Sequence, residues 1–136
     1  MSNVKVLIAD DEKDVLEVMQ RKISAAGYDV LTAYDGEEAW EKIRKELPDV
    51  VVLDLTMPKI DGLEVLKNLR EDKTITKWIP VVIVSARGEL NDMKKGFDLE
   101  ADHYITKPCR MEDVLKAIKL MINLIPQHKG HEDKKE

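Results

Sequence analysis

Short apolar runs alternate with segments of helical periodicity along this chain of 136 residues. The apolar runs predict strands at residues 4–9, 28–33, 50–53, 81–84 and 103–106. Between and after these runs, apolar side chains recur every three or four positions, which predicts five amphipathic helices. Strict alternation of strands and helices is typical of βαβ units, and it predicts an α/β protein with a parallel sheet.

Capping and chain-breaking residues bound the predicted helices. Gly27 ends the first helix, Asp35 opens a capping box at the second, the dipeptide Asp61-Gly62 precedes the third, and Pro126 ends the fifth. The apolar positions of the five helices are, in order, Val15, Leu16, Met19 and Ile23; Ala39, Trp40, Ile43 and Leu47; Leu63, Leu66 and Leu69; Leu90, Met93 and Phe97; and Met111, Val114, Leu115, Ile118, Ile122 and Ile125.

Connection rules constrain how these elements assemble. Right-handed crossovers place helices on both faces of a doubly wound, five-stranded parallel sheet, whose strand order reverses next to the first strand. Residues 1–125 are expected to form one domain, which suits the length of the chain. Residues 126–136 offer little to bury and are expected to form a polar, mobile tail.

Composition and charge exclude several classes of function. The net charge of −5 provides no basic surface for a phosphate backbone, so no direct contact with nucleic acid is expected. No stretch approaches the roughly 18 to 20 apolar residues that span a bilayer, and no apolar signal segment precedes the first strand. The single cysteine, Cys109, cannot form an internal disulfide. A cytoplasmic protein without membrane insertion is expected.

Polar residues of particular kinds end four of the predicted strands. Asp10 and Asp11 follow the first strand, Asp54 the third, Ser85 the fourth and Lys107 the fifth. The carboxyl ends of parallel strands meet at one edge of the sheet, where open α/β folds bind ligands. Three acids repel one another unless a cation lies among them, and a neighbouring lysine favours an anion. The set therefore predicts a hard metal ion beside a phosphoryl group.

Each of these residues also has an ordinary explanation when it is considered alone. Acids after the first strand can lie at the start of a helix, where they favour the helix dipole. Asp54 can be an acid that begins a loop, and Lys107 can be a solvated lysine before a proline turn. Convergence of all these residues on one sheet edge favours the functional interpretation.

Four segments resemble a known family. Their sequences are IADDE at residues 8–12, LDLTMPKIDG at 53–62, VSA at 84–86 and YITKP at 104–108. In this order they resemble the receiver domain of two-component response regulators, over about residues 4–125. The resemblance implies a flavodoxin-like fold with strand order 2-1-3-4-5. It also implies a signalling phosphoacceptor rather than an enzyme.

The resemblance assigns roles to the acidic residues. Asp54 would accept a phosphoryl group from a histidine kinase or a phosphotransfer protein, and the domain would itself catalyse this transfer and the later hydrolysis. Asp10, Asp11 and Asp54 would bind Mg²⁺ together with the backbone carbonyl of Thr56, and Asp11 is the preferred direct ligand.

The resemblance also assigns roles at the fourth and fifth strands. Ser85 and Lys107 would hold the phosphoryl oxygens. Ser85 and Tyr104 would form a switch, although Tyr104 can also be an ordinary half-buried strand residue. The chain departs from the family pattern at Glu100, where a glycine is usual, and at Cys109, where an aromatic is common; a small packed residue is the expected role of Cys109.

Two rival functions use similar residues. A phosphatase of the haloacid-dehalogenase type also forms an aspartyl phosphate, but it places a second acid two residues after the nucleophile, where this chain has Thr56. A degenerate receiver would serve only as a scaffold, although every expected site residue is present. No output domain is visible, so we expect a stand-alone receiver, a relay component or a fragment of a larger regulator.

An apolar strip beside the core stripe of the last helix predicts a contact surface. Ala117, Leu120 and Leu124 lie on this strip. Together with the helix around residues 90–97 and the strand at 103–106, the strip would bind a downstream protein or a second copy of the chain after phosphorylation. Alternatively, the strip rests on the chain's own tail or on a neighbouring helix.

Overall fold

The computed structural model describes residues 3–86 and 101–134, with side chains described as far as residue 126. The elements, in chain order, are β1 (Lys5–Ala9), α1 (Lys13–Ala25), β2 (Asp29–Ala33), α2 (Gly36–Glu46), β3 (Val50–Leu53), α3 (Gly62–Glu71), β4 (Val81–Ser85), β5 (His103–Thr106) and α5 (Met111–Lys134). The fourth predicted helix, at Leu90, Met93 and Phe97, lies outside the described residues, as does Glu100.

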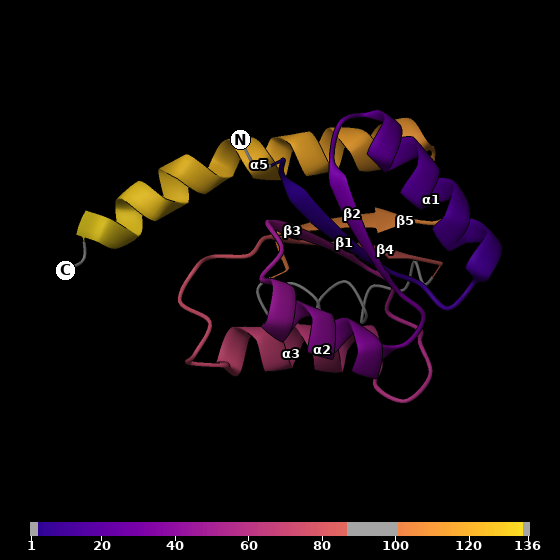
Figure 1. Ribbon diagram of the computed structural model, residues 1–136, viewed down its shortest axis with the longest axis horizontal. Coiled ribbons are helices and arrows are strands. Elements are labelled where there is room, and N and C mark those ends of the chain that lie inside the picture. Colours follow the sequence, from indigo (N-terminus) through magenta and orange to yellow (C-terminus); the bar gives the residue numbers. More distant parts are fainter. Residues whose placement is uncertain (1–2, 87–100, 135–136) are drawn as a thin grey trace.

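The five strands form one parallel sheet in the order β2-β1-β3-β4-β5. This order confirms the predicted reversal next to the first strand, because β1 lies between β2 and β3. In register, Ala9 at the end of β1 pairs with Ala33 of β2 and with Leu53 of β3. Figure 1 shows α1 and α5 on one face of the sheet and α2 and α3 on the other.

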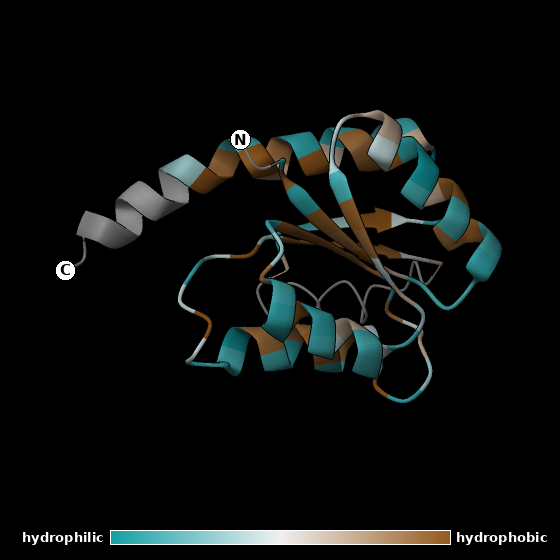
Figure 2. Cartoon of the chain, viewed as in Figure 1, coloured by the Kyte–Doolittle hydropathy of each residue, from teal (hydrophilic) through white to brown (hydrophobic). Residues whose placement is uncertain are grey.

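Alternation along the strands divides the core into two layers. On β1, Leu7 and Ala9 pack in the cluster that contains the buried residues of α2 and α3, whereas Val6 and Ile8 pack with those of α1 and α5. All four residues are at most 1% exposed. A strand buried on both faces is expected to be continuously apolar, as the central strands are (Figure 2).

Local hydrogen bonds confirm the predicted start of α2. The carboxylate of Asp35 accepts a bond from the backbone N–H of Glu38 at 2.8 Å. The carboxylate of Glu38 accepts a bond from the backbone N–H of Tyr34 at 2.7 Å. This reciprocal capping fixes the point at which the chain leaves β2 and enters α2.

The last helix does not end where the sequence predicts. Pro126 lies inside α5, which continues to Lys134, so the expected end at Pro126 is wrong. A proline removes one backbone donor from a helix, but Pro126 is exposed and the following residues include several Lys and Glu, which favour a helix. Among the described residues, no helix is long and apolar enough to cross a membrane.

The apolar strip on α5 is narrower than the helical wheel predicts. Ala117 is only 3% exposed and belongs to the core beneath α1 and α5, so its assignment to the surface is wrong. Leu124 is half-buried against the same core cluster. Leu120 is 48% exposed and is the member of the strip that faces solvent. The core face of α5 is widened because the helix packs against both the sheet and α1.

Candidate functional site

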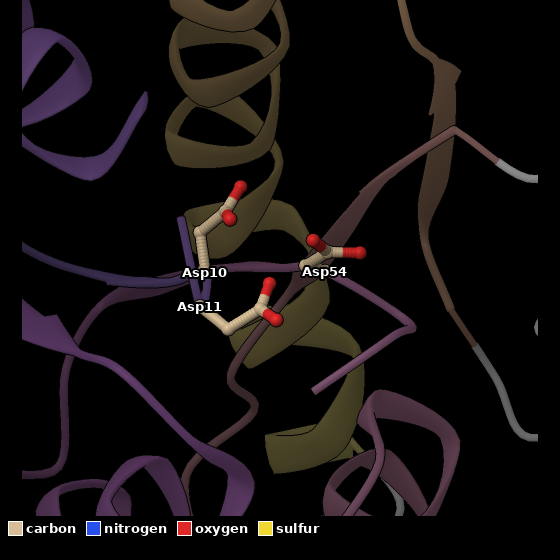
Figure 3. A group of neighbouring side chains, drawn as sticks. All are labelled: Asp10, Asp11 and Asp54. Atoms are coloured by element: carbon tan, nitrogen blue, oxygen red, sulfur yellow. The ribbon is translucent and has the colours of Figure 1, made fainter. Parts of the chain in front are cut away.

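Three carboxylates meet at the carboxyl ends of β1 and β3. The backbone continues the ladder beyond the strands, since the N–H of Asp10 donates to Ala33 at 3.1 Å and that of Asp54 donates to Ala9 at 3.0 Å. One carboxylate oxygen from each of Asp10, Asp11 and Asp54 lies within 4.8 Å of the others. Figure 3 shows the three side chains arising from neighbouring strand ends. The predicted convergence of these acids is therefore present.

Lys107, which follows the edge strand β5, reaches this cluster with its ammonium group. Its Nζ lies 2.8 Å from Oδ2 of Asp10 and 3.4 Å from Oδ2 of Asp54. Lys107 follows β5, and its backbone N–H donates to the carbonyl of Ser85 at 2.7 Å, which extends the pairing of β4 and β5 by one residue. The side chains of Asp10 and Lys107 are 3% and 19% exposed, so this ion pair is largely withdrawn from water.

Backbone donors fix the orientation of two carboxylates. The N–H of Glu12 donates to Oδ1 of Asp10 at 2.9 Å, and the N–H of Thr56 donates to Oδ1 of Asp54 at 3.0 Å. Asp10 does not cap α1, because the helix begins at Lys13 and its capping residue is Glu12, with no side-chain cap bond. Both oxygens of Asp10 are engaged, whereas Asp11 is exposed beside them.

The electrostatic balance of the cluster is unfavourable to the charge of Asp54. Burial raises the pKa of Asp54, and the neighbouring Asp10 raises it further, against the opposing effects of the Thr56 N–H and Lys107. Burial alone would lower the pKa of Lys107, but its contacts with Asp10 and Asp54 outweigh this effect and raise it. Lys107 contacts two of the three carboxylates, and its single positive charge does not balance three negative ones, so the site favours a further cation.

The donor set fits a hard divalent cation. Carboxylate oxygens are the ligands that such ions prefer, and three of them are already within range of a common centre. Asp11 and Asp54 present oxygens toward the space beside Asp10 (Figure 3). The three acids thus form a candidate site for a metal ion.

Ser85 and Tyr104 lie on the adjacent strands β4 and β5. Ser85 is the last residue of β4, is 1% exposed and pairs in register with Thr106. Tyr104 pairs in register with Ile83 and is half-buried against the core layer that contains α2 and α3. The two residues predicted to form the switch thus lie on paired strands.

An apolar groove of about 610 Å³ opens beside Lys107, between α1 and α5. The apolar side chains that line it include Val15, Val18, Met19, Val84, Met111 and Val114. Cys109 also borders this groove and is half-buried. Burial raises the pKa of the Cys109 thiol, with Lys107 acting in the opposite direction. The half-buried position of Cys109 among apolar side chains fits its expected role as a small packed residue.

Two glycines lie close to the backbone behind the site, and no role at the site was predicted for them from the sequence. A Cβ on Gly62, the first residue of α3, would lie 2.2 Å from the backbone oxygen of Asp54. A Cβ on Gly36, the first residue of α2, would lie 1.7 Å from the backbone oxygen of Ile60. Both follow an aspartate, so the sequence signal is an Asp-Gly dipeptide at a helix start, which also marks an ordinary turn.

The chain is similar to known proteins in sequence and in structure. It matches the family described as "Response regulator receiver domain" over residues 6–119. It is 41% identical over 120 residues to the alkaline phosphatase synthesis transcriptional regulatory protein PhoP of Bacillus subtilis, covering 88% of this chain and 49% of that protein. The chain thus spans about half the length of the curated relatives it matches.

Two solved structures extend this likeness. The receiver domain of the Francisella response regulator 1452 is 34% identical, with a TM-score of 0.82 and coverage of 89% of this chain and 98% of that one. A chain in the CheX-CheY-BeF3-Mg+2 complex of Borrelia burgdorferi is 32% identical, with a TM-score of 0.76 and coverage of 84% of this chain and 85% of that one. With the strand order and the acidic edge in place, these matches confirm the resemblance: the chain belongs to the receiver domain family of response regulators.

Proposed function

We propose that this chain is a Mg²⁺-dependent phosphoacceptor in which Asp54 receives the phosphoryl group. The observation that carries the proposal is the contact of Lys107 with both Asp10 and Asp54 inside a cluster of three carboxylates. A lysine and a metal-binding set on either side of one reactive carboxylate supply the two positive centres that phosphoryl transfer requires.

Asp10, Asp11, Asp54 and the backbone carbonyl of Thr56 are the proposed ligands of Mg²⁺. Asp11 is a better direct ligand than Asp10, because both oxygens of Asp10 already accept hydrogen bonds. When bound, Mg²⁺ would neutralise charge on the transferred phosphoryl oxygens. The presence of Mg+2 and BeF3 in the similar Borrelia complex supports this choice of ion.

The chemical step is an in-line transfer from a phosphorylated imidazole to a carboxylate oxygen of Asp54. The P–N bond of the donor breaks as the new P–O bond forms, and the imidazole leaves with its electron pair and takes up a proton from water. The Thr56 N–H orients the attacking carboxylate, and Lys107 together with the Ser85 hydroxyl holds the phosphoryl oxygens. Catalysis comes from positioning and charge neutralisation, and attack by water later restores Asp54.

A histidine kinase or a phosphotransfer protein is the proposed phosphoryl donor. The apolar groove between α1 and α5 borders Lys107, so a donor seated there would hold its imidazole within reach of the site. The exposed residue Val18 lies in this groove and is 45% exposed. A free thiol at Cys109 suits the reducing cytoplasm, which is the proposed compartment.

The proposed output is a change of the surface formed by β5 and α5. Movement of the Ser85 hydroxyl toward a bound phosphoryl group would pull on the end of β4 and alter the packing of Tyr104 on β5. A groove of about 420 Å³ on this surface is lined by Tyr104, Lys116 and Leu120 among others. A downstream protein or a second copy of the chain would bind there. The relative PhoP of Bacillus subtilis is a transcriptional regulatory protein by name, yet the net charge of −5 gives this chain no basic surface for nucleic acid.

Two alternatives make different predictions for one experiment. Incubation with acetyl phosphate and Mg²⁺, followed by intact mass, should give a lasting adduct of about 80 Da, the mass of one phosphoryl group. Rapid release of phosphate without an adduct would instead indicate a phosphatase, which Thr56 disfavours because it supplies no carboxyl group. Neither an adduct nor phosphate release would indicate a scaffold. Chelation of the metal should abolish the adduct.

A further inference from the structure

The loop between β3 and α3 carries one side of the proposed metal site and closes tightly behind Asp54. The loop spans residues 54–61, and the N–H of Gly62, the first residue of α3, donates back to the carbonyl of Leu55 at 2.9 Å. The same loop supplies the Thr56 N–H that orients Asp54. Its position therefore sets both the direction of the carboxylate and the place of the Thr56 carbonyl.

The far side of this loop rests on the first turn of α2. The N–H of Gly36 donates to the carbonyl of Pro58 at 3.3 Å. Ile60 also lies close to Gly36 and leaves no room for a side chain there. A Cβ added to Gly36 would lie 1.7 Å from Ile60 O, 2.5 Å from Ile60 C and 2.9 Å from Ile60 Cβ. These obstacles are mainly backbone atoms, which no rotamer change can move away.

Charge adds a second link between the loop and α2. The Nζ of Lys59 lies 3.6 Å from a carboxylate oxygen of Asp35 and 3.7 Å from one of Glu37. Lys59 adopts a φ of 69°, in the left-handed region that residues other than glycine seldom occupy. The loop is thus held in a strained conformation against a helix that comes from a different βα unit of the sheet.

We propose that Gly36 is a positioning residue for the metal and phosphoryl site. By allowing α2 to touch the backbone at Ile60, it sets the depth at which the loop sits, and hence the place of Thr56 relative to Asp54 and Asp11. This inference rests on the proposed Mg²⁺-dependent phosphorylation of Asp54. A side chain at position 36 would push the loop away from α2 and spread the ligand set.

The test compares Gly36→Ala with Gly27→Ala. Gly27 has a φ of 101° and nothing within 4 Å of its added Cβ, so its substitution strains the backbone without reaching the loop. If both variants remain folded, Gly36→Ala should weaken Mg²⁺ binding by about tenfold or more in calorimetric titration, and Gly27→Ala by less than about twofold. In metal-free protein, the amide resonance of Thr56 should shift in Gly36→Ala and stay in place in Gly27→Ala.

A second variant covers the case in which Gly36→Ala fails to fold. Lys59→Met removes the ion pairs to Asp35 and Glu37 and adds no steric conflict. Loss of a nearby cation would by itself strengthen Mg²⁺ binding, whereas release of the loop should weaken it, by about twofold to threefold if the exposed pairs are of ordinary strength. The matched control is Lys77→Met, whose partner is Asp49 near the amino-terminal end of β3 and which should leave binding unchanged.

The parent protein separates the two proposals. If the parent binds no Mg²⁺ and gains no phosphoryl group, the proposed function fails. If the parent does both, the positioning role of Gly36 is overturned by a Gly36→Ala variant that matches Gly27→Ala in Mg²⁺ affinity and in the Thr56 resonance. It is equally overturned if Gly36→Ala does not fold and Lys59→Met binds Mg²⁺ as tightly as the parent or more tightly.

Discussion

The Nζ of Lys107 lies 2.8 Å from Oδ2 of Asp10, although 97 positions separate the two residues in the chain. The contact joins the ends of β1 and β5, which are not neighbours in the sheet, and it passes over the end of β3, where Asp54 lies. Because both partners are largely buried, the pair stabilises the fold only while it is complete; removal of one partner leaves a buried, uncompensated charge.

We expect Lys107→Met to destabilise the metal-free protein by about 2 to 4 kcal/mol, since Asp10 and Asp54 lose their ammonium partner. Mg²⁺ should recover part of this loss, because a cation among the carboxylates replaces the missing charge. Urea denaturation with and without Mg²⁺ measures both effects. The control Lys77→Met breaks an exposed pair and should cost less than about 1 kcal/mol. Equal losses in the two variants would contradict the buried-pair account.

The raised pKa of Asp54 predicts that Asp54→Asn is more stable than the parent without metal. Burial raises the folded-state pKa above the ordinary value of 3.8, so the folded state binds the proton of Asp54 more tightly than the unfolded state does. The stability that this proton provides is fully present below pH 3.8 and is lost as the pH rises through the folded-state pKa. Once the buried carboxyl is ionised, the folded state bears the cost of its charge, and Asn avoids that cost. We therefore expect a higher Tm for Asp54→Asn than for the parent in metal-free buffer near pH 7. The gap should narrow as the pH falls toward 4.

Saturating Mg²⁺ should reverse that order. The parent gains binding energy that Asp54→Asn cannot match, amounting to about 3 to 4 kcal/mol at roughly 10 mM Mg²⁺ if Kd is in the tens of micromolar. Asp11→Ala should also lose most of this response, because Asp11 is the proposed direct ligand. Thermal denaturation across a Mg²⁺ series measures these shifts. A parent whose Tm ignores Mg²⁺, or an Asp11→Ala variant that responds fully, would count against the proposed ligand set.

Substitutions at two exposed apolar residues, Val18 and Leu120, test the kinase-docking surface and the output surface separately. Val18→Glu places a charge in the groove beside Lys107, and it should slow phosphorylation by a histidine kinase that acts on the parent by about tenfold. Its rate with acetyl phosphate, which needs no docking surface, should not change.

Leu120→Glu lies on the β5–α5 groove and should leave both rates unchanged. In light scattering or partner pulldown, it should weaken phosphorylation-dependent association. A Leu120→Glu variant that slows the kinase, or a Val18→Glu variant that does not, would refute this division.

Patterns of strand ends and sheet topology were sufficient to predict the fold and the gathering of acids. Asp10, Asp54 and Lys107 each follow an apolar run, and the rule that parallel strands end at one edge brings them together without further information. The capping box at Asp35 was also predictable, because Glu38 lies only three residues after Asp35 and four after Tyr34.

Contacts between distant segments, and the width of a buried face, were not predictable from the sequence. The approach of Gly36 to Ile60 depends on how α2 and the loop after β3 pack, and its only signal in the sequence is an Asp-Gly dipeptide, which also marks an ordinary turn. The burial of Ala117 depends on α5 packing against both α1 and the sheet, which a helical wheel does not contain. Pro126 was predicted to end α5, yet one missing donor at an exposed position does not stop the helix.

Intact mass of the parent and of Asp54→Asn, after matched incubation with acetyl phosphate and Mg²⁺, tests the central claim most directly. Asn is nearly isosteric with Asp, so the variant should keep the fold, which its denaturation curve verifies. The parent should gain about 80 Da, the mass of one phosphoryl group, and Asp54→Asn should gain nothing. A parent without an adduct, or a variant with an undiminished one, would contradict Asp54 as the phosphoryl acceptor.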